Sequence, residues 1–396
     1  MQESQPKART AKTIVAIYSA SLLCQLANSL SLVTQGVVDT YPGVTLSSAQ
    51  GVLSVSSLFI LFGSLAAGKL ANYTTKKNIV LICVLLDFVS GLLGYFCTFN
   101  LAMVYVAGCV AGFASGALLS AVLALIPEHF QGKQCALFMG LQSVAISVGA
   151  MLINGIGGAI SAIYWKNIFL VYIVIVVINI IVALLMPKGK VEKPETGEKV
   201  KVFTPFVGIM ILFGFFVGVQ LITLNANITM YVYELGIGNE AQSGLVTTAY
   251  AVGSLATGLG VTFLMKFFKK RVFAAALVCG AVGLWLLALV HSVAVFMLAG
   301  FLIGCCFNLH NVCYYTIAPM NAAPAAVTMS ISLYTAGMTL GMVLGPFIVT
   351  PLGALLGDSI SCCFVVGAIL LTVMAVLELF LPRILHGYQL ELPEEN

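Results

Sequence analysis

The sequence predicts an all-α integral membrane protein with twelve transmembrane helices in two similar halves. Of the 396 residues, 60% are hydrophobic and 8% are charged, whereas soluble proteins carry about 25% charged residues. Apolar runs long enough to cross a bilayer, about 20 residues each, recur along the whole chain. No strand-like alternation accompanies them, and helices satisfy their backbone hydrogen bonds inside lipid. A helical membrane protein follows from these observations.

Twelve apolar segments can be placed in order along the chain. We expect spans at about residues 13–38, 46–71, 78–98, 101–126, 134–161, 167–186, 205–232, 240–267, 272–291, 293–318, 324–354 and 359–382. The polar, basic start leads directly into a full-length apolar run, so we expect no cleaved signal peptide. The 11 cysteines lie almost wholly in apolar runs without metal-ligand spacing, so we expect small buried residues and no metal.

Basic residues mark one side of the predicted membrane. Of the 18 lysines and arginines, all but Lys166 lie on the side of the N-terminus. Loops on the other side carry the acidic residues Asp39, Glu234, Glu240 and Asp358. Because cytoplasmic loops are enriched in Lys and Arg, both termini are predicted in the cytoplasm, with an even number of spans. The net charge of +4 comes from these basic loops. We therefore expect no nucleic-acid partner.

The two halves of the chain repeat each other. The longest charged stretch, KGKVEKPETGEKVK at residues 188–201, leaves six spans on either side. The motif GSLAAG in span two returns as GSLATG in span eight, and Gly149 precedes Gly341 by 192 residues. The predicted organisation is an N-terminal six-helix bundle at 1–186, a cytoplasmic linker at 187–204 and a C-terminal six-helix bundle at 205–396. Like-oriented repeats of this kind relate the halves of some transporters.

Two passages of the chain carry recognisable motifs. The loop after span two, from Gly68 to Lys77, reads GKLANYTTKK and resembles the G-x-L-a-D-r-x-G-r-k signature of the major facilitator superfamily. The stretch from Gly157 to Phe169 is similar to the family's GG…WR-x-x-F passage into span six. The whole chain resembles this superfamily, and within it the drug:proton antiporter-like branch. The resemblance implies the major facilitator fold, alternating access and a central cavity lined by spans one, four, seven and ten.

The matched motifs also supply candidate gating residues. Where the family signature has an aspartate this chain has Asn72, and where proton-coupled members have an arginine in span four it has Gly108. Span eleven has small residues at every fourth position and then a proline, which permits close helix packing and a bend. The predicted gating residues are Asn72, Lys76, Lys77, Gly341, Gly345 and Pro346.

Polar side chains fall at helical spacing on spans one, seven and ten. Amides donate and accept hydrogen bonds without the cost of burying a charge, which suits recognition of an organic solute. The alternative is that each amide bonds a neighbouring helix, an interaction of about 0.6 kcal/mol on average. We predict substrate contacts from Gln25, Asn28, Gln220, Asn227, Asn308, His310, Asn311 and Tyr314.

Few ionisable groups lie within the predicted spans. An ionised group is costly in lipid, so an intramembrane acid is a functional candidate, and imidazole titrates near neutral pH. The predicted proton-coupling residues are His310, Asp87 and Glu128, with a structural helix contact as the alternative for Asp87. Glu378 stands close to the end of span twelve, where we expect an interfacial side chain.

These features predict a secondary active transporter of a small organic solute in the cytoplasmic (inner) membrane, coupled to protons or to a counter-solute. Uptake and efflux, and symport and antiport, stay open. The alternatives are a non-transporting membrane sensor and a lipid flippase on the same fold. No phosphate loop, HExxH motif or nucleophile–histidine–acid set occurs, so we expect neither enzymatic activity nor a cofactor. The expected partners are the substrate, membrane lipids and protons, and the expected state is a monomer.

Overall fold

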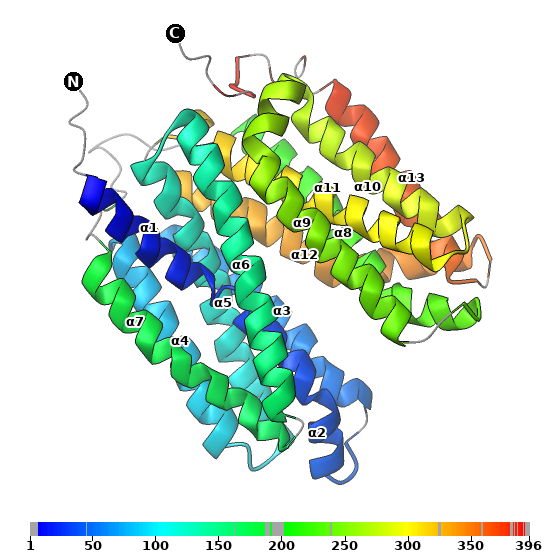
Figure 1. The fold of residues 1–396 in the computed structure, drawn as a ribbon, viewed down its shortest axis with the longest axis horizontal. Helices are drawn as coiled ribbons and strands as arrows, with labels where there is room; N and C mark the ends of the chain where they lie inside the picture. The colour runs from blue at the N-terminus through cyan, green and yellow to red at the C-terminus, as the bar shows by residue number, and fades with distance from the viewer. Residues whose placement is uncertain are drawn as a thin grey trace. The chain divides into compact units, whose positions relative to one another are not determined.

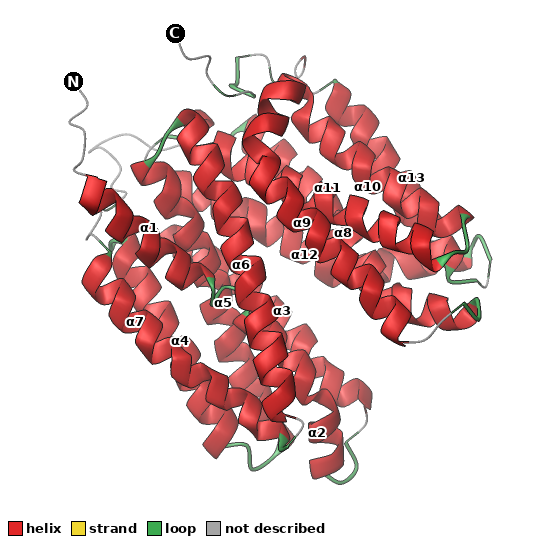
Figure 2. Cartoon of the chain, viewed as in Figure 1, coloured by secondary structure: helices red, strands yellow, loops and turns green. Residues whose placement is uncertain are grey.

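All secondary structure in the described part of the chain is helical (Figure 2). The computed structural model describes residues 7–44, 46–161, 163–186, 191, 202–237, 240–323, 326–357, 359–380, 383, 385, 387–390 and 392. The helices of the first half are α1 (Lys7–Ser21), η1 (Leu26–Val33), α2 (Thr34–Thr40), α3 (Leu46–Leu70), α4 (Lys76–Phe96), α5 (Leu101–His129), α6 (Gly132–Ser161), η2 (Trp165–Tyr172) and α7 (Ile173–Leu185). The helices of the second half are α8 (Pro205–Glu234), α9 (Glu240–Phe268), η3 (Lys269–Arg271), α10 (Val272–Leu289), α11 (Val293–Asn321), α12 (Val327–Ala354) and α13 (Ser361–Leu379).

The helices account for the twelve predicted spans. Among the described residues, 10 stretches are long and apolar enough to cross a membrane, and one of them, Gln242–Leu289, contains both α9 and α10. The first predicted span is interrupted: α1, η1 and α2 follow one another along it. Counting α9 and α10 separately and α1–η1–α2 as one span gives the expected twelve.

The chain forms two compact units. The first comprises residues Met1–His129, Ala145–Val200 and Ala323–Ala336, and the second comprises Phe130–Val144, Lys201–Ala322 and Gly337–Asn396. Within the second unit α9 packs on α11, α11 on α10 and α10 on α13 (Figure 1). In the first unit the largest contact is between α3 and α5. The domain boundaries expected from the sequence stay a prediction.

The helix α4 shows why these helices need lipid around them. Its buried face consists largely of small and polar residues, among them Cys83, Asp87, Ser90 and Gly91. Its exposed face carries large apolar side chains: Ile82, Leu85, Val89, Leu92 and Phe96. Water disfavours such a continuous apolar face, whereas lipid accepts it, and small inward residues let helices approach closely.

The sequence repeat is also a repeat of helix contacts. A Cβ atom at Gly149 in α6 would overlap the backbone oxygen of Leu22, which directly follows α1. A Cβ atom at Gly341 in α12 would overlap the backbone oxygen of Phe215 in α8. The glycines are 192 residues apart and their partners 193. At both positions the absence of a side chain therefore allows two helix backbones to approach closely.

Candidate functional site

A histidine and a glutamate meet in the interior of the second unit. The Nε2 atom of His310, in α11, lies 3.0 Å from the Oε1 atom of Glu378, in α13, and neither side chain is exposed. The rings of Phe273 and Phe213 lie against the imidazole, with centroid distances of 5.2 Å and 6.5 Å. The position of Glu378 near a helix end suggested an interfacial side chain, and that expectation is wrong: the residue is only 2% exposed.

A polar contact continues from this pair to α8. The Sγ of Cys306, one helical turn before His310, donates to the Oε1 of Gln220 at 3.1 Å. Cys306 also interacts electrostatically with Glu378. The Nε2 of Gln220 is buried and has no hydrogen-bond partner among the described residues. The predicted substrate residue Gln220 therefore joins the predicted coupling residue His310 in one cluster, with an unused amide donor.

The remaining predicted residues of α11 lie close to this cluster along the helix. Asn311 is 5% exposed, and Tyr314 is fully buried. The ring of Tyr314 stacks on Phe206 in α8, with a centroid distance of 6.0 Å. Phe206 in turn stacks on Tyr388 of the C-terminal segment at 5.7 Å. This part of α11 is thus held against α8 by aromatic packing.

Asn308 makes a helix contact instead. Its Nδ2 donates to the backbone oxygen of Ser254 at 2.8 Å and lies 3.4 Å from the Oγ1 of Thr257, both in α9. The position 192 residues earlier is Gly116, where a Cβ atom would overlap the backbone oxygen of Ile60 in α3. The equivalent helix contacts of the two halves therefore differ: α5 contacts α3 through a glycine, and α11 contacts α9 through an amide hydrogen bond.

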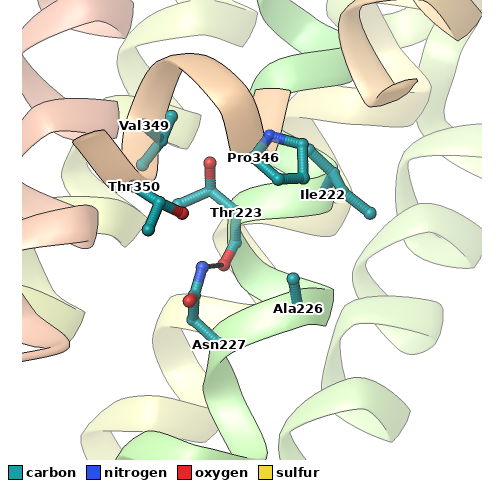
Figure 3. A pocket seen from close by; sticks show the side chains of 7 residues that line it. All are labelled: Ile222, Thr223, Ala226, Asn227, Pro346, Val349 and Thr350. Atoms are coloured by element: carbon teal, nitrogen blue, oxygen red, sulfur yellow. Dashed lines mark hydrogen bonds between the residues drawn. The ribbon is translucent and has the colours of Figure 1, made fainter. Parts of the chain in front are cut away.

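Asn227 borders a small cavity within the second unit (Figure 3). The cavity has a volume of about 20 Å³, room for about one water molecule. Its walls are Ile222, Thr223, Ala226 and Asn227 from α8 and Pro346, Val349 and Thr350 from α12. The Nδ2 of Asn227 donates to the backbone oxygen of Thr223 at 2.9 Å, and the predicted gating residue Pro346 forms part of the opposite wall.

Two of the predicted gating and coupling residues form an ion pair in the first unit. The Nζ of Lys76, at the start of α4, lies 2.8 Å from the Oε2 of Glu128, near the end of α5. The side chains are 5% and 19% exposed. The adjacent Lys77 donates to the backbone oxygen of Met186, after α7, at 2.7 Å. These lysines therefore tie α4 to α5 and α7, while Asn72 lies in the half-buried turn before α4.

The other predicted residues have separate surroundings. Gly341 and Gly345 of α12 both face α8, where a Cβ atom would overlap Phe215 and Ile222 respectively. Gln25 is half-buried in the turn between α1 and η1, and the side chain of Asn28 lies outside the described residues. Asp87 in α4 is fully buried, and neither of its carboxylate oxygens has a hydrogen-bond partner among the described residues.

Sequence reasoning missed Glu378 and Cys306 as members of the cluster around His310. The signal for Glu378 was present, because a carboxylate inside an apolar span calls for a partner. Its partner is 68 residues away in the chain, so the pairing required the fold. No group of three or more potential metal ligands occurs in the described part of the chain.

Comparisons with known proteins agree on the fold. A family model described as Major Facilitator Superfamily matches residues 17–240 and 210–395. No curated protein matches the chain. Three solved structures with similar folds are the proton:xylose symporter XylE bound to 6-bromo-6-deoxy-D-glucose, the human organic anion transporter MFSD10 (TETRAN), and the transporter FucP in the outward conformation.

The structural similarity extends over nearly the full length of each chain. For XylE the TM-score is 0.75 at 13% identity, covering 97% of this chain and 97% of that chain. For MFSD10 it is 0.78 at 14% identity, covering 94% and 100%. For FucP it is 0.71 at 14% identity, covering 93% and 98%. With the family match spanning both halves, this protein belongs to the major facilitator superfamily and has its twelve-helix transporter fold.

Proposed function

We propose that this protein is a secondary active transporter that moves a small neutral organic solute across the cytoplasmic membrane by alternating access, driven by protons. The observation that carries the proposal is the pair of His310 and Glu378, which has no exposed side-chain surface. Packing of α11 against α13 does not require ionisable side chains. Because ionisable groups are costly inside a membrane protein, a pair of them here indicates a function.

The pair is suited to hold one proton. A neutral imidazole with a protonated carboxyl and an imidazolium with a carboxylate have the same net charge of zero. Loss of the shared proton would leave a net negative charge in a medium where it is poorly solvated. If one transport state admits water to the pair and the other does not, the proton affinity differs between them, which is what coupling requires.

The charge of the solute follows from the predicted cavity spans. The segments 13–38, 101–126, 205–232 and 293–318 contain neither lysine nor arginine. An organic anion would need a cationic partner there, so we propose a neutral solute, although MFSD10 is described as an organic anion transporter. XylE is described as a proton:xylose symporter, and it supports proton coupling on this fold.

Amide groups would recognise that solute. Gln220 offers an unused donor beside Cys306, and Asn227 and Asn311 lie on the same two helices, α8 and α11. Binding at Gln220 would place the solute near His310, so that solute and proton affect each other through direct contacts. We further propose that both termini lie in the cytoplasm, because the basic residues cluster on one side. We also propose that the protein is a monomer surrounded by membrane lipids.

Proteoliposome transport tests the proposal. A thermal-shift screen of the purified protein against metabolites and drugs identifies a ligand, because binding stabilises the folded state by mass action. Accumulation of that ligand is then measured with and without an imposed pH gradient. Acceleration by the gradient supports proton coupling, and its direction distinguishes symport from antiport. Transport that ignores the gradient would contradict proton coupling and leave a uniporter or an exchanger.

A further inference from the structure

The first unit buries an acid that no described residue neutralises. Asp87 is 0% exposed, and both carboxylate oxygens lack a hydrogen-bond partner in the described part of the chain. An ionised carboxylate in such a place costs several kcal/mol unless something compensates it. A purely structural acid is normally hydrogen-bonded, because an unsatisfied buried polar group destabilises the fold. Asp87 therefore calls for a partner that the described part of the chain does not provide.

Three hydroxyl groups come from this part of the unit: Ser90 follows Asp87 by one turn of α4, Tyr172 ends η2, which packs on α4, and Ser29 lies in η1, which packs on η2. Tyr172 interacts electrostatically with Asp87 and contacts Ser29 and Ser90, but its hydroxyl makes no hydrogen bond of good geometry. The hydroxyl of Ser29 donates to the backbone oxygen of Leu26 at 2.7 Å. That of Ser90 donates to the backbone oxygen of Ala107 at 2.8 Å. With their protons directed to backbone oxygens, the two serine oxygens keep lone pairs for a cation.

The backbone around the cluster is built unlike that of an ordinary span. Ser29 lies in η1 and Tyr172 ends η2, so two 3-10 segments meet here. η2 packs on α4, and the ring of Tyr172 occupies the place where Gly91 lacks a side chain. Discontinuous helices in transporters place unwound carbonyl groups at coupling-ion sites. Carboxylate, hydroxyl and carbonyl oxygens together are the ligands of hard cations.

We propose that Asp87, Ser29, Ser90 and Tyr172 bind a monovalent cation, and sodium is the ion with which we test it. One carboxylate balances one positive charge, whereas a divalent ion would leave a net charge in the protein interior. The thiols of Cys24 and Cys83 are the other titratable groups that interact with Asp87. They are neutral, soft ligands, and no described set of three acids, histidines or cysteines converges on a metal position. This site is separate from the pair of His310 and Glu378 and does not rest on the proposed substrate transport.

Thermal unfolding of the purified full-length protein tests the site. Tm is measured in NaCl, KCl and choline chloride at equal ionic strength and fixed pH. We expect a saturable rise of about 2 °C or more in NaCl alone, because a ligand of the native state stabilises it. Asp87→Asn should abolish the rise. Asp39→Asn, which changes an exposed acid in α2, should keep it.

A second measurement covers the case in which Asp87→Asn does not fold. Binding of ²²Na⁺ to the wild-type protein should be displaced by unlabelled sodium but not by potassium. Ser90→Ala should raise the half-saturating sodium concentration about 10-fold. Equal Tm values in the three salts, or a sodium response that survives Asp87→Asn, would overturn the proposal.

Discussion

His310 and Glu378 stand 68 residues apart in the chain and meet at 3.0 Å without any exposed side-chain surface. The contact joins α11 to α13, helices that each also pack on α10. An ordinary helix contact in a membrane protein uses small residues, and this one uses an imidazole and a carboxyl group. This contact is the proposed proton-coupling site, and the first prediction concerns substitution of each of its two residues.

His310→Gln and Glu378→Gln should each abolish accumulation driven by a pH gradient while sparing counterflow exchange of solute. Either change removes one member of the pair that shares the proton, whereas exchange needs no net proton movement. The measurement is solute uptake into proteoliposomes with and without the gradient. His291→Gln, which changes an exposed histidine, is the matched control and should behave as wild type. Gradient-driven uptake by the His310→Gln variant would exclude this pair as the coupling site.

The amides of α8 and α11 should divide into two groups on substitution by alanine. Gln220→Ala, Asn227→Ala and Asn311→Ala should weaken solute binding 10-fold or more, since a lost hydrogen bond to a ligand costs about 1.4 kcal/mol. Asn308→Ala should instead lower stability by about 0.6 kcal/mol, because its amide bonds Ser254 of α9. Isothermal titration and thermal unfolding separate the two effects. If all three α8 and α11 variants bind as wild type, these amides are packing groups.

The ion pair of Lys76 and Glu128 should stabilise the first unit. The side chains are 5% and 19% exposed, between a surface pair and a fully buried one. Removing one charge, as in Lys76→Gln or Glu128→Gln, should cost about 1–3 kcal/mol of unfolding free energy. The double variant should lose less than the sum, which a double-mutant cycle measures. Additive losses would show that the two side chains do not depend on each other.

Gly341→Ala should destabilise the second unit by about 1–3 kcal/mol, because the added methyl group overlaps the backbone oxygen of Phe215. Gly149→Ala should do the same at the contact with Leu22 in the first unit. Gly260→Ala is the matched control, since nothing lies within 4 Å of its Cβ position in α9. That change should be neutral or slightly stabilising through helix propensity. Thermal unfolding of the three variants decides, and equal Tm values would exclude close backbone packing at Gly341.

Reporter fusions at residue 195 and at residue 238 should lie on opposite sides of the membrane. The expectation rests on the clustering of basic residues, which favours cytoplasmic loops. Alkaline phosphatase should be active at position 238 and inactive at position 195, with a cytoplasmic reporter giving the converse. The same side for both positions would overturn the predicted orientation and the count of spans between them.

The fold class and the order of the spans could be predicted from the amino-acid sequence alone. Apart from the first and the sixth, each predicted segment matches one helix to within a few residues, for example 46–71 against Leu46–Leu70 and 205–232 against Pro205–Glu234. The reason is local: an apolar run of membrane-crossing length must form a helix to satisfy its backbone groups. The signal is carried by each segment alone, without knowledge of its neighbours.

The interruption of the first span was not predictable in this way. An uninterrupted helix was expected over residues 13–38, and the structure has α1, a turn, η1 and α2 there. The backbone N–H of Ala27 in η1 donates to the Oγ of Ser115 in α5, 88 residues away. A hydroxyl on another helix thus satisfies a backbone group that a regular helix would have satisfied internally, and its position depends on the packed bundle.

Which polar residues meet was likewise decided by tertiary structure alone. The sequence marked His310, Asp87 and Glu128 as ionisable groups within or beside apolar spans, because hydropathy is a property of each position. Only the packed helices gave His310 a buried glutamate, gave Glu128 a lysine and left Asp87 without a described hydrogen-bond partner. Which side chains meet depends on how each helix is rotated about its axis and on the angle at which two helices cross. Both are determined by packing between small residues that are far apart in the chain.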